Sequence, residues 1–545
     1  AAGDINQNFT TDFLVDLAEP PAPAAHYWVV DDETTLPADL TAAAAAHNIM
    51  RVVTWKTSKH TGADPKEVIP YYLEKYGRYD HTDSFEYFDI DTYQLETPTP
   101  DFDAAETLQP LAVDFGGQLQ LTGFALGNAG DVAQVTEPQA NSNDLLWLRL
   151  AWQKVGDQPE DLKVSALLYA DNGQLVSQVD KLLLNNILQV GSAAWEPGTA
   201  ADTYILLPIP PATPPGRYSL ELAVYGAESL TRLPITAAAG DRLPLSPVTI
   251  LPARQPVEPA ELTLALPVGQ EPLPGLTLVG FETLPGESVS AGSEVWASLL
   301  WQAAAPLADD VTMSLLVEPV EGQEATPISE PVGLAGSGYP TSQWQPGEML
   351  RGWLKARISP TLEPGLYVLK LRLAAATDDE LIILPIGEFQ IEGWPRNFEP
   401  PAPQVEMDAV FNEQARLVGL DAGAAQVAPG DTLTTRLYWQ AEAEFEQSYT
   451  AFVQVIGPDG RLYGQMDHIP GGGAFPTTGW LSGEYLTDEY AIPIAADAPP
   501  GDYQLAIGLY DSSTGQRLPL SRSTCQTVSC NEGDDAVRLP GLTVK

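Results

Sequence analysis

Positive charge is scarce in this chain. Its 545 residues contain 27 Lys and Arg against 73 Asp and Glu, which gives a formal net charge of −46 at pH 7. A nucleic-acid interface needs clustered Lys and Arg to meet the phosphates, so this composition argues against that class of function. The same negative field opposes docking on anionic lipid. We interpret the charge as a source of solubility and self-repulsion outside the cytoplasm.

Long apolar runs and cysteine are scarce as well. No run approaches the roughly 18 apolar residues of a membrane-spanning helix, so no bilayer span is expected. The two cysteines, Cys525 and Cys530, have no second pair and no His beside them. That pattern disfavours zinc and predicts a small disulfide loop in an oxidising, extracytoplasmic compartment. The start at Ala1 lacks signal-peptide features and is interpreted as a mature end or a fragment. Asn8 opens a formal glycosylation sequon, Asn-Phe-Thr.

The usual catalytic signatures are missing from the sequence. It contains no Gly-x-Ser-x-Gly elbow, no His-Glu-x-x-His, no Walker loop and no dinucleotide-binding glycine pattern. The chain is therefore predicted not to be an enzyme, and no catalytic residue is assigned. Four of the five histidines lie in the first 81 residues, at His26, His47, His60 and His81.

What the chain does contain is an internal repeat. Three Pro-Gly-x-Tyr turns end at Tyr218, Tyr367 and Tyr503, and a Trp lies 23 residues before each, at Trp195, Trp344 and Trp480. A Trp-Gln pair precedes these Trp residues by 43, 43 and 41 residues, beginning at Trp152, Trp301 and Trp439. The spacing indicates three copies of a repeat of about 140 residues, which is the size of an independent domain.

The strand that carries each Trp-Gln pair alternates apolar and polar residues. In the third copy Leu433, Thr435, Leu437 and Trp439 share one face. This alternation predicts a half-buried antiparallel strand with its Trp inward. Roughly seven such strands, with the Pro-Gly-x-Tyr turn as a Tyr corner, predict an immunoglobulin-like β-sandwich. Sandwiches are expected at residues 111–250, 262–392 and 405–545, joined by proline-stiffened linkers at 96–110, 251–275 and 393–404.

Residues 1–97 are predicted to form a small α/β domain. Strands at 26–30, 51–55 and 84–95 alternate with helices at 37–48 and from an Asp64 cap to about Gly77, and this βαβαβ order implies a small parallel sheet with right-handed crossovers. Its carboxyl edge would gather Asp31, Asp32, Lys56, Lys59 and His60, either as a ligand site or as polar loop ends. His47 and His81 would lie at the opposite edge from His60, so no metal site is expected. The predicted fold class is thus mainly β, an α/β domain followed by three sandwiches.

The most elaborate loop runs from Gln465 to Asp488 in the third copy. Its candidate ligand-binding residues are Asp467, His468, Trp480, Glu484 and Asp488. A loop Trp can stack on a sugar ring, and neighbouring carboxylates can bind hydroxyl groups. The alternative is that each Trp packs into the end of its own sandwich, which the fixed spacing to the Tyr favours. No cofactor is expected, and calcium at this loop is the one alternative.

Five segments of the third copy occur together in one family. They are Leu437-Tyr-Trp-Gln440, Gln465-x-Asp467-x-x-Pro470, Pro476-Thr-x-x-Trp480-x-x-Gly-Glu484, Pro499-Pro-Gly-x-Tyr503 and Gly508–Pro519. They resemble the β-sandwich modules at the C-termini of bacterial protein-mannosyltransferase-like membrane glycosyltransferases. Residues 26–95 are similar to the soluble α/β segment that follows the last membrane helices there. The resemblance implies that the catalytic acids and the lipid-sugar site belong to a membrane half outside this chain.

Two functions from different classes fit these features. In the first, the sandwiches are structural and pack against further copies or another cell-envelope partner, as subunits of a surface layer or filament. In the second, they bind glycan as an accessory module of a membrane glycosyltransferase. We favour the structural reading, because the repeated aromatic residues are expected to be buried.

Overall fold

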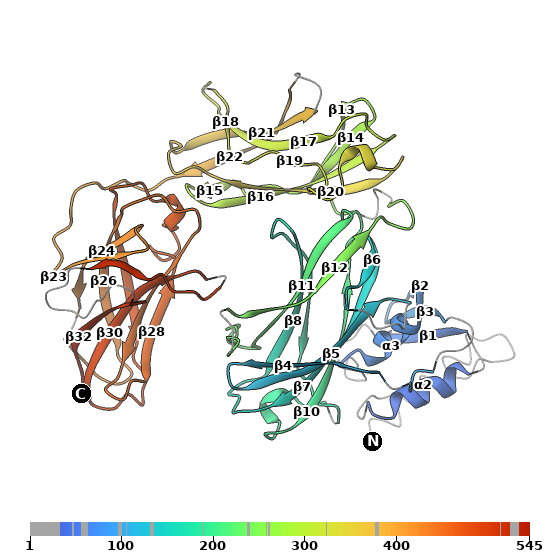
Figure 1. Cartoon of the computed structure of the whole chain (residues 1–545), viewed down its shortest axis with the longest axis horizontal. Helices are drawn as coiled ribbons and strands as arrows, with labels where there is room; N and C mark the ends of the chain where they lie inside the picture. Colours follow the sequence, from blue (N-terminus) through green and yellow to red (C-terminus); the bar gives the residue numbers. More distant parts are fainter. Residues whose placement is uncertain are drawn as a thin grey trace. The chain divides into compact units, whose positions relative to one another are not determined.

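The fold is mainly β (Figure 1), with 53% of the described residues in strands and 6% helical. The computed structural model describes residues 33–45, 48–55, 64–95, 101–104, 106–130, 136–187, 189–236, 240–257, 259, 262–322, 324–375, 381–423, 425–512, 514–523 and 534–545. The chain divides into two compact units, Ala1–Val257 and Glu258–Lys545, which are described separately. Among the described residues, no helix is long and apolar enough to cross a membrane.

Several residues singled out from the sequence lie outside the described part of the chain. They are Asn8, His26, Asp31, Asp32, His47, Lys56, Lys59, His60, Cys525 and Cys530, together with the predicted strand at 26–30. The disulfide and the glycosylation site therefore stay predictions.

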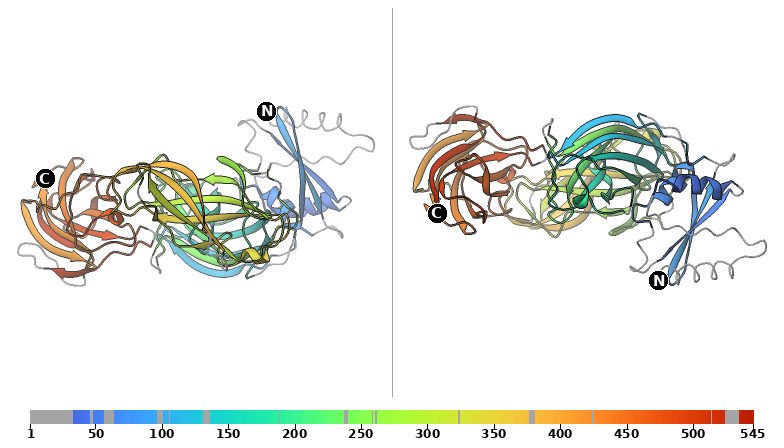
Figure 2. Two further views of the ribbon diagram at one scale, coloured as in Figure 1. Left: turned by 90° about the horizontal axis from the view of Figure 1, so that it is seen from above. Right: turned by 90° about the horizontal axis from the view of Figure 1, so that it is seen from below.

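The described part of the first unit begins with two helices and a three-stranded sheet, together called the helical layer. The helices are α2 (Leu36–Ala44) and α3 (Val68–Tyr76), and the strands are β1 (Ile49–Trp55), β2 (Gly77–Ser84) and β3 (Phe88–Leu95). The strand order is β1-β3-β2, and both pairings are antiparallel. The prediction of a parallel βαβαβ sheet is therefore wrong for the described residues, and the carboxyl edge expected to gather a ligand site loses its basis. Figure 2 shows the blue strands as a strongly twisted ribbon.

The departure from the parallel prediction arises at the end of α3. Strand β2 starts at Gly77, directly after the helix, and returns as a hairpin with β3 instead of crossing over. Gly77 permits this abrupt change, because a Cβ there would lie 2.7 Å from the Gln94 carbonyl oxygen. The residues of β2 after Gly77 are all exposed, so no apolar pattern marks them as a strand.

Helix α3 keeps its predicted Asp64 cap but begins later than expected. The Asp64 carboxylate accepts hydrogen bonds from the Val68 N–H (2.9 Å) and the Ile69 N–H (2.8 Å). These N–H groups have no partner within the helix, so the cap satisfies them. Glu67 has a left-handed φ of 57°, which excludes it from the first helical turn.

A pair of sheets follows in the first unit (Figure 1), here called the first sheet pair. The sheet orders are β10-β7-β5-β4 and β6-β12-β11-β8-β9. The strands are β4 (Gln109–Phe115), β5 (Leu119–Asn128), β6 (Gln139–Asn141), β7 (Leu145–Lys154), β8 (Leu162–Ala170), β9 (Leu175–Leu182), β10 (Ala200–Pro208), β11 (Gly216–Gly226) and β12 (Arg242–Leu251). In β7 the alternate residues Leu146, Leu148, Leu150 and Trp152 are all buried, as their period-two pattern predicts.

The helical layer and the first sheet pair share one hydrophobic core. Tyr71 and Leu73 of α3 pack in the same cluster as Trp147 of β7 and Tyr204 of β10. Phe102, in the expected linker, is buried in that cluster as well. The layer therefore covers a face of the β10-β7-β5-β4 sheet instead of enclosing a core of its own.

The second unit contains two sheet pairs. The second sheet pair has orders β13-β14-β16-β20 and β15-β22-β21-β17-β18, with β19 also paired to β17. Its strands are β13 (Leu266–Leu273), β14 (Leu276–Thr283), β15 (Ser288–Ser290), β16 (Glu294–Ala303), β17 (Val311–Pro319), β18 (Thr326–Pro327), β19 (Val332–Gly333), β20 (Met349–Arg357), β21 (Gly365–Ala375) and β22 (Ile382–Glu392). One core containing Trp301, Trp344 and Tyr367 joins its sheets.

The third sheet pair has orders β29-β26-β24-β23-β31 and β25-β32-β30-β27-β28. Its strands are β23 (Val405–Phe411), β24 (Ala415–Ala422), β25 (Gln426–Val427), β26 (Thr432–Ala441), β27 (Thr450–Ile456), β28 (Leu462–His468), β29 (Tyr485–Pro493), β30 (Gly501–Tyr510), β31 (Leu520–Ser523) and β32 (Val537–Val544). Its core contains Trp439, Trp480 and Tyr503.

Two local arrangements recur in all three sheet pairs. A 3-10 turn, η1 (Ser192–Ala194), η3 (Thr341–Gln343) or η4 (Thr477–Gly479), leads into the repeated Trp. The indole Nε1 then donates to the carbonyl oxygen five residues earlier, at 3.0, 3.2 and 3.0 Å. Each Pro-Gly-x-Tyr hydroxyl donates to the carbonyl oxygen four residues earlier, at 2.7, 2.9 and 2.8 Å. The Tyr-corner bond predicted from the sequence is therefore present three times.

Replacing Tyr367 by Phe should lower the free energy of unfolding by about 1 kcal/mol, because the Glu363 carbonyl loses a partly buried hydrogen bond from the hydroxyl. Urea unfolding measures the loss. Tyr463→Phe serves as the control, since the Tyr463 hydroxyl bonds the exposed Asp459 carboxylate. Equal effects of the two substitutions would contradict a structural role for the corner.

Candidate functional site

The loop selected from the sequence is built around Trp480. Its side chain is fully buried, and the ring packs edge-on against Phe445 at a centroid distance of 5.5 Å. Trp195 and Trp344 are equally enclosed, at 4% and 0% exposure. None of these three indole faces is open to a sugar ring, so the packing alternative describes them.

Asp488 lies on β29, at one edge of the third sheet pair. Its side chain is fully buried and accepts hydrogen bonds from His468 Nε2 (2.8 Å), the Gly471 N–H (2.8 Å) and the Tyr490 hydroxyl (2.7 Å). His468 stacks on Tyr490 with ring centroids 4.3 Å apart. Burial raises the pKa of the Tyr490 hydroxyl above its ordinary range. Because β28 and β29 belong to different sheets, this cluster ties the two sheets together.

Asp467 does not join this cluster. It is adjacent to His468 on β28, and successive residues of a strand point to opposite faces. Asp467 is exposed. Of the predicted set, His468 and Asp488 are thus brought together, and Asp467 is directed elsewhere.

Glu484 is bound by residues that sequence analysis assigned to a linker. Its side chain is 1% exposed and accepts hydrogen bonds from Trp394 Nε1 (2.9 Å), Arg396 Nη1 (2.8 Å) and the Leu481 N–H (3.0 Å). The Arg396 guanidinium also stacks on the Trp394 ring, 4.4 Å from its centroid. The segment at 393–404 therefore enters the loop instead of spacing two domains. The feature of the sequence that could have indicated this contact is the presence of a Trp and an Arg inside a proline-rich stretch.

Hydrogen bonds from side chains to backbone carbonyl groups connect the same loop to the second sheet pair. Arg357, the last residue of β20, donates to the carbonyl oxygens of Thr478 (2.9 Å), Glu446 (3.1 Å) and Phe445. The Thr478 hydroxyl donates to the Gly292 carbonyl oxygen at 2.6 Å. A Cβ on Gly292 would lie 2.2 Å from the Gly479 Cα, so the two backbones meet directly.

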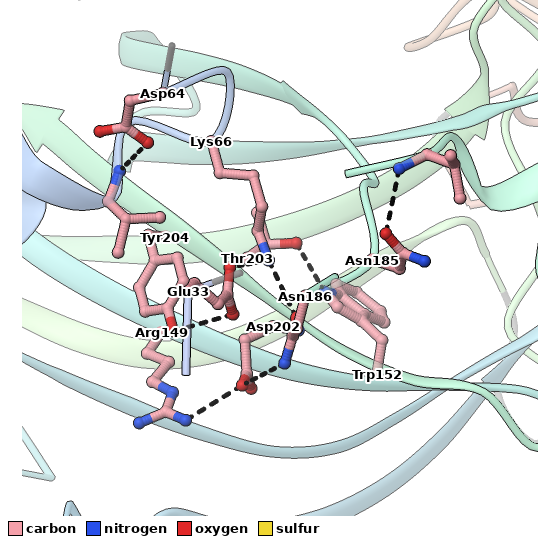
Figure 3. Close-up of polar contacts among 12 residues, drawn as sticks. Glu33, Asp64, Lys66, Arg149, Trp152, Asn185, Asn186, Asp202, Thr203 and Tyr204 are labelled. Atoms are coloured by element: carbon pink, nitrogen blue, oxygen red, sulfur yellow. Dashed lines mark hydrogen bonds and ion pairs between the residues drawn. The ribbon is translucent and has the colours of Figure 1, made fainter. Parts of the chain in front are cut away.

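A second polar cluster lies under the helical layer of the first unit (Figure 3), and sequence analysis missed it. Lys66 and Glu33 form an ion pair of 2.5 Å with both side chains about 3% exposed, and the Tyr204 hydroxyl donates to Glu33 at 3.2 Å. Burial raises the pKa of Glu33 to about 7 against the opposing effect of Lys66. Burial also lowers the pKa of Lys66.

This cluster continues across the β10-β7-β5-β4 sheet. Lys66 donates to Asn186 (2.9 Å), Asn186 donates to Asp202 (3.2 Å), and Arg149 pairs with both Asp202 (3.0 Å) and Glu106 (3.2 Å). Glu106 in turn pairs with Lys75 at 2.5 Å. Glu33, Asp202 and Glu106 balance Lys66, Arg149 and Lys75, so the network is neutral overall.

Perturbed pKa values mark functional sites and structural ion-pair networks alike. Here every charge has a partner within the network, and the hydrogen bonds from Tyr204 to Glu33 and from Lys66 to Asn186 cross between the helical layer and the sheet pair, which indicates a joint between them. The residues of this cluster are spread from position 33 to position 204, so no spacing in the sequence predicts that they come together. In the part of the chain that the structure describes, no group of three or more His, Cys, Asp or Glu side chains is placed to hold a metal ion.

Comparisons with known proteins give no family. No family model matches the chain, and no curated protein matches it. Among solved structures it is similar to the C-terminal domain of wzt, at 13% identity and a TM-score of 0.20 over 27% of this chain and 82% of that one. It is also similar to a family 123 glycoside hydrolase from Clostridium perfringens (11%, TM-score 0.13, 21% of this chain and 24% of that one). A third match is dimeric latent PorU from Porphyromonas gingivalis (10%, 0.20, 83% and 35%). The chain spans well under two thirds of the last two proteins, and TM-scores this low carry no argument about fold or function.

Asp488→Asn should destabilise the second unit by about 2 kcal/mol, because the amide presents donors where Asp488 accepts three hydrogen bonds. Asp497→Asn, at an exposed position, is the control and should be neutral. Chemical unfolding at neutral pH measures both. Unchanged stability in Asp488→Asn would instead favour a ligand-binding role for this carboxylate.

Glu74→Gln should remove part of the pH dependence of the first unit. Burial raises the pKa of Glu74 from 4.5 to about 7. The folded state therefore holds the proton more tightly than the unfolded state, and stability falls as pH rises from 4.5 to about 7. The full loss is about 3 kcal/mol.

Glutamine stays neutral, so unfolding at pH 5 and pH 8 should show a smaller difference in the Gln variant than in the parent chain. Glu228→Gln, at an exposed position, should change nothing. An identical pH dependence of the Glu74→Gln variant and the parent chain would contradict the shift.

Proposed function

We propose that this chain is a non-catalytic, extracytoplasmic protein of the cell envelope with a structural role, as a subunit of a surface layer or filament. The observation that carries the proposal concerns the predicted ligand loop. Trp480, Glu484 and Asp488 are buried, and both carboxylates are satisfied by groups of the same chain. A recognition loop would need these groups open to a ligand.

The finer architecture belongs to the same proposal. We take the helical layer as a small α/β module and the three sheet pairs as immunoglobulin-like sandwich repeats. Support comes from the Trp and Tyr hydrogen bonds, which occur at the same offsets in each pair. The resemblance to the C-terminal region of protein-mannosyltransferase-like glycosyltransferases supports release from, or kinship with, such a membrane precursor.

A glycan-binding accessory role is the second candidate, and exposed aromatic side chains favour it. Tyr79, Phe85 and Tyr87, on and beside β2, are 47%, 41% and 57% exposed. Exposed rings can stack on sugars, so a glycan site would use this hairpin and not the Gln465–Asp488 loop.

Electron microscopy of native material should show repetitive assemblies. Because the net charge is −46, contact between copies has to overcome repulsion, whose range lengthens from about 8 Å at 0.15 M salt to about 30 Å at 0.01 M. Assemblies should therefore loosen at low salt, and a chelator tests for bridging divalent cations. Monodisperse monomers with and without chelator, together with saturable binding on a glycan array, would replace the structural role by the glycan-binding one.

A further inference from the structure

The three Trp turns leave polar acceptors that need a donor. In the second and third sheet pairs the residue after the Trp donates its N–H to a carboxylate four residues after the Trp, Gln345 to Glu348 (2.8 Å) and Leu481 to Glu484 (3.0 Å). Beside that carboxylate lies the carbonyl oxygen of the residue just before the Trp. In the third turn both acceptor residues are buried, Gly479 and, at 1% exposure, Glu484, so leaving them without a donor would be costly, whereas the acceptors of the second turn are only partly buried.

Each turn finds its donor differently, and in the first sheet pair the acceptors differ as well, because Lys154 bonds other carbonyl groups of the turn and not that of Ala194 just before the Trp. In the first, Lys154 of β7 donates to the carbonyl oxygens of Ser192 (3.3 Å), Ala193 (3.1 Å) and Trp195 (2.6 Å). In the second, the Tyr339 hydroxyl donates to the Gln343 carbonyl oxygen and to Glu348, both at 3.1 Å. Both donors belong to the sheet pair that they complete.

The third sheet pair lacks a hydroxyl donor of its own at this position. Phe475 stands where the second pair has Tyr339, since the carbonyl of each accepts the indole N–H five residues on. Arg396 Nη1 takes the place of the missing hydroxyl and donates to the Gly479 carbonyl oxygen (2.9 Å) and to Glu484 (2.8 Å). These two acceptors correspond to Gln343 and Glu348, the acceptors of Tyr339.

We infer that Trp394-Pro395-Arg396 is a latch that locks the second sheet pair to the third, and that the missing hydroxyl of Phe475 is what makes the latch necessary. The same guanidinium donates to the Pro360 carbonyl oxygen of the second pair at 3.0 Å, so one side chain bridges both. Trp394 packs on Phe475 with ring centroids 5.2 Å apart. Gly479 makes room for it, because a Cβ there would lie 2.5 Å from the Trp394 ring.

The stretch between β12 and β13, shorter than the linker predicted at 251–275 because β13 begins at Leu266, carries an arginine with a different use. Arg254 donates to Asn141 (2.9 Å) and pairs with Asp144 (3.1 Å), both of the first sheet pair. The second sheet pair, whose turn is completed by Tyr339, does not need it.

The test is chymotryptic cleavage after Phe398, which follows the latch by two residues and is 53% exposed, with the cut identified by mass spectrometry. Phe475→Tyr should accelerate cleavage by about tenfold or more, because its hydroxyl competes with Arg396 for both acceptors. Arg396→Ala should accelerate it similarly. Tyr339→Phe, the reciprocal change in the second pair, is the matched control and should leave the rate unchanged.

The double variant Phe475→Tyr with Arg396→Ala separates a latch from general destabilisation. The latch predicts that Arg396→Ala adds little once the hydroxyl introduced by Phe475→Tyr satisfies the acceptors, so the two effects are far from additive. Additive acceleration, or parental cleavage in Phe475→Tyr, would overturn the inference. The outcome is independent of the proposed structural role, since a latched chain can be monomeric and an assembling chain can have a loose junction.

Discussion

Each sheet pair closes on a buried tryptophan whose indole N–H needs an acceptor, and most of the recurring local structure follows from that need. The acceptor lies five residues earlier, which forces a compact 3-10 turn between the two. The Gly three residues after each Trp has a φ of 88°, 81° or 86°, a region that residues with a Cβ rarely adopt. The indole, the turn and the glycine thus form one structural unit. The polar atoms of this unit need hydrogen-bond donors from residues at the same end of the sheet pair.

Where those polar atoms find a donor decides how independent each sheet pair is. A donor from within, such as Lys154 or Tyr339, completes the pair by itself. A donor from the linker, such as Arg396, makes two pairs interdependent. The helical layer follows the same logic, because Tyr204 and Asn186 of the first sheet pair bond to Glu33 and Lys66, and Lys75 of α3 pairs with Glu106. Buried polar networks tolerate few alternative arrangements, since leaving any member unpaired is costly.

The sequence predicted what depends on local periodicity and missed what depends on pairing at a distance. Mainly β structure, inward Trp residues and Tyr corners all follow from alternation and fixed offsets, and all three are present. The antiparallel pairing of the three-stranded sheet does not follow from such local patterns. It depends on Gly77 and on strand β2, whose polar, exposed residues show no alternation of buried and exposed positions. The loop residues were singled out as a candidate ligand site, yet Trp394 and Arg396 lie 90 and 88 residues away from their partner Glu484. A loop rich in acidic residues resembles a ligand site when the partners of its carboxylates are unknown. The sequence alone does not distinguish a carboxylate that is paired within the chain from one that is free to bind a ligand.

Different charged groups are responsible for the contacts that stabilise the chain internally and for the repulsion between chains. The buried network of the first unit is neutral, and buried Glu484 and Asp488 are matched by donors, so little of the −46 net charge lies in these joints. Exposed acidic side chains of the described residues, such as Asp497 and Glu228, contribute to the excess, and salt screens them there. Internal joints of this kind respond weakly to ionic strength because they are desolvated, whereas contacts between copies respond strongly. An acidic chain of this construction can keep its internal joints fixed while its association is set by the ionic conditions around it.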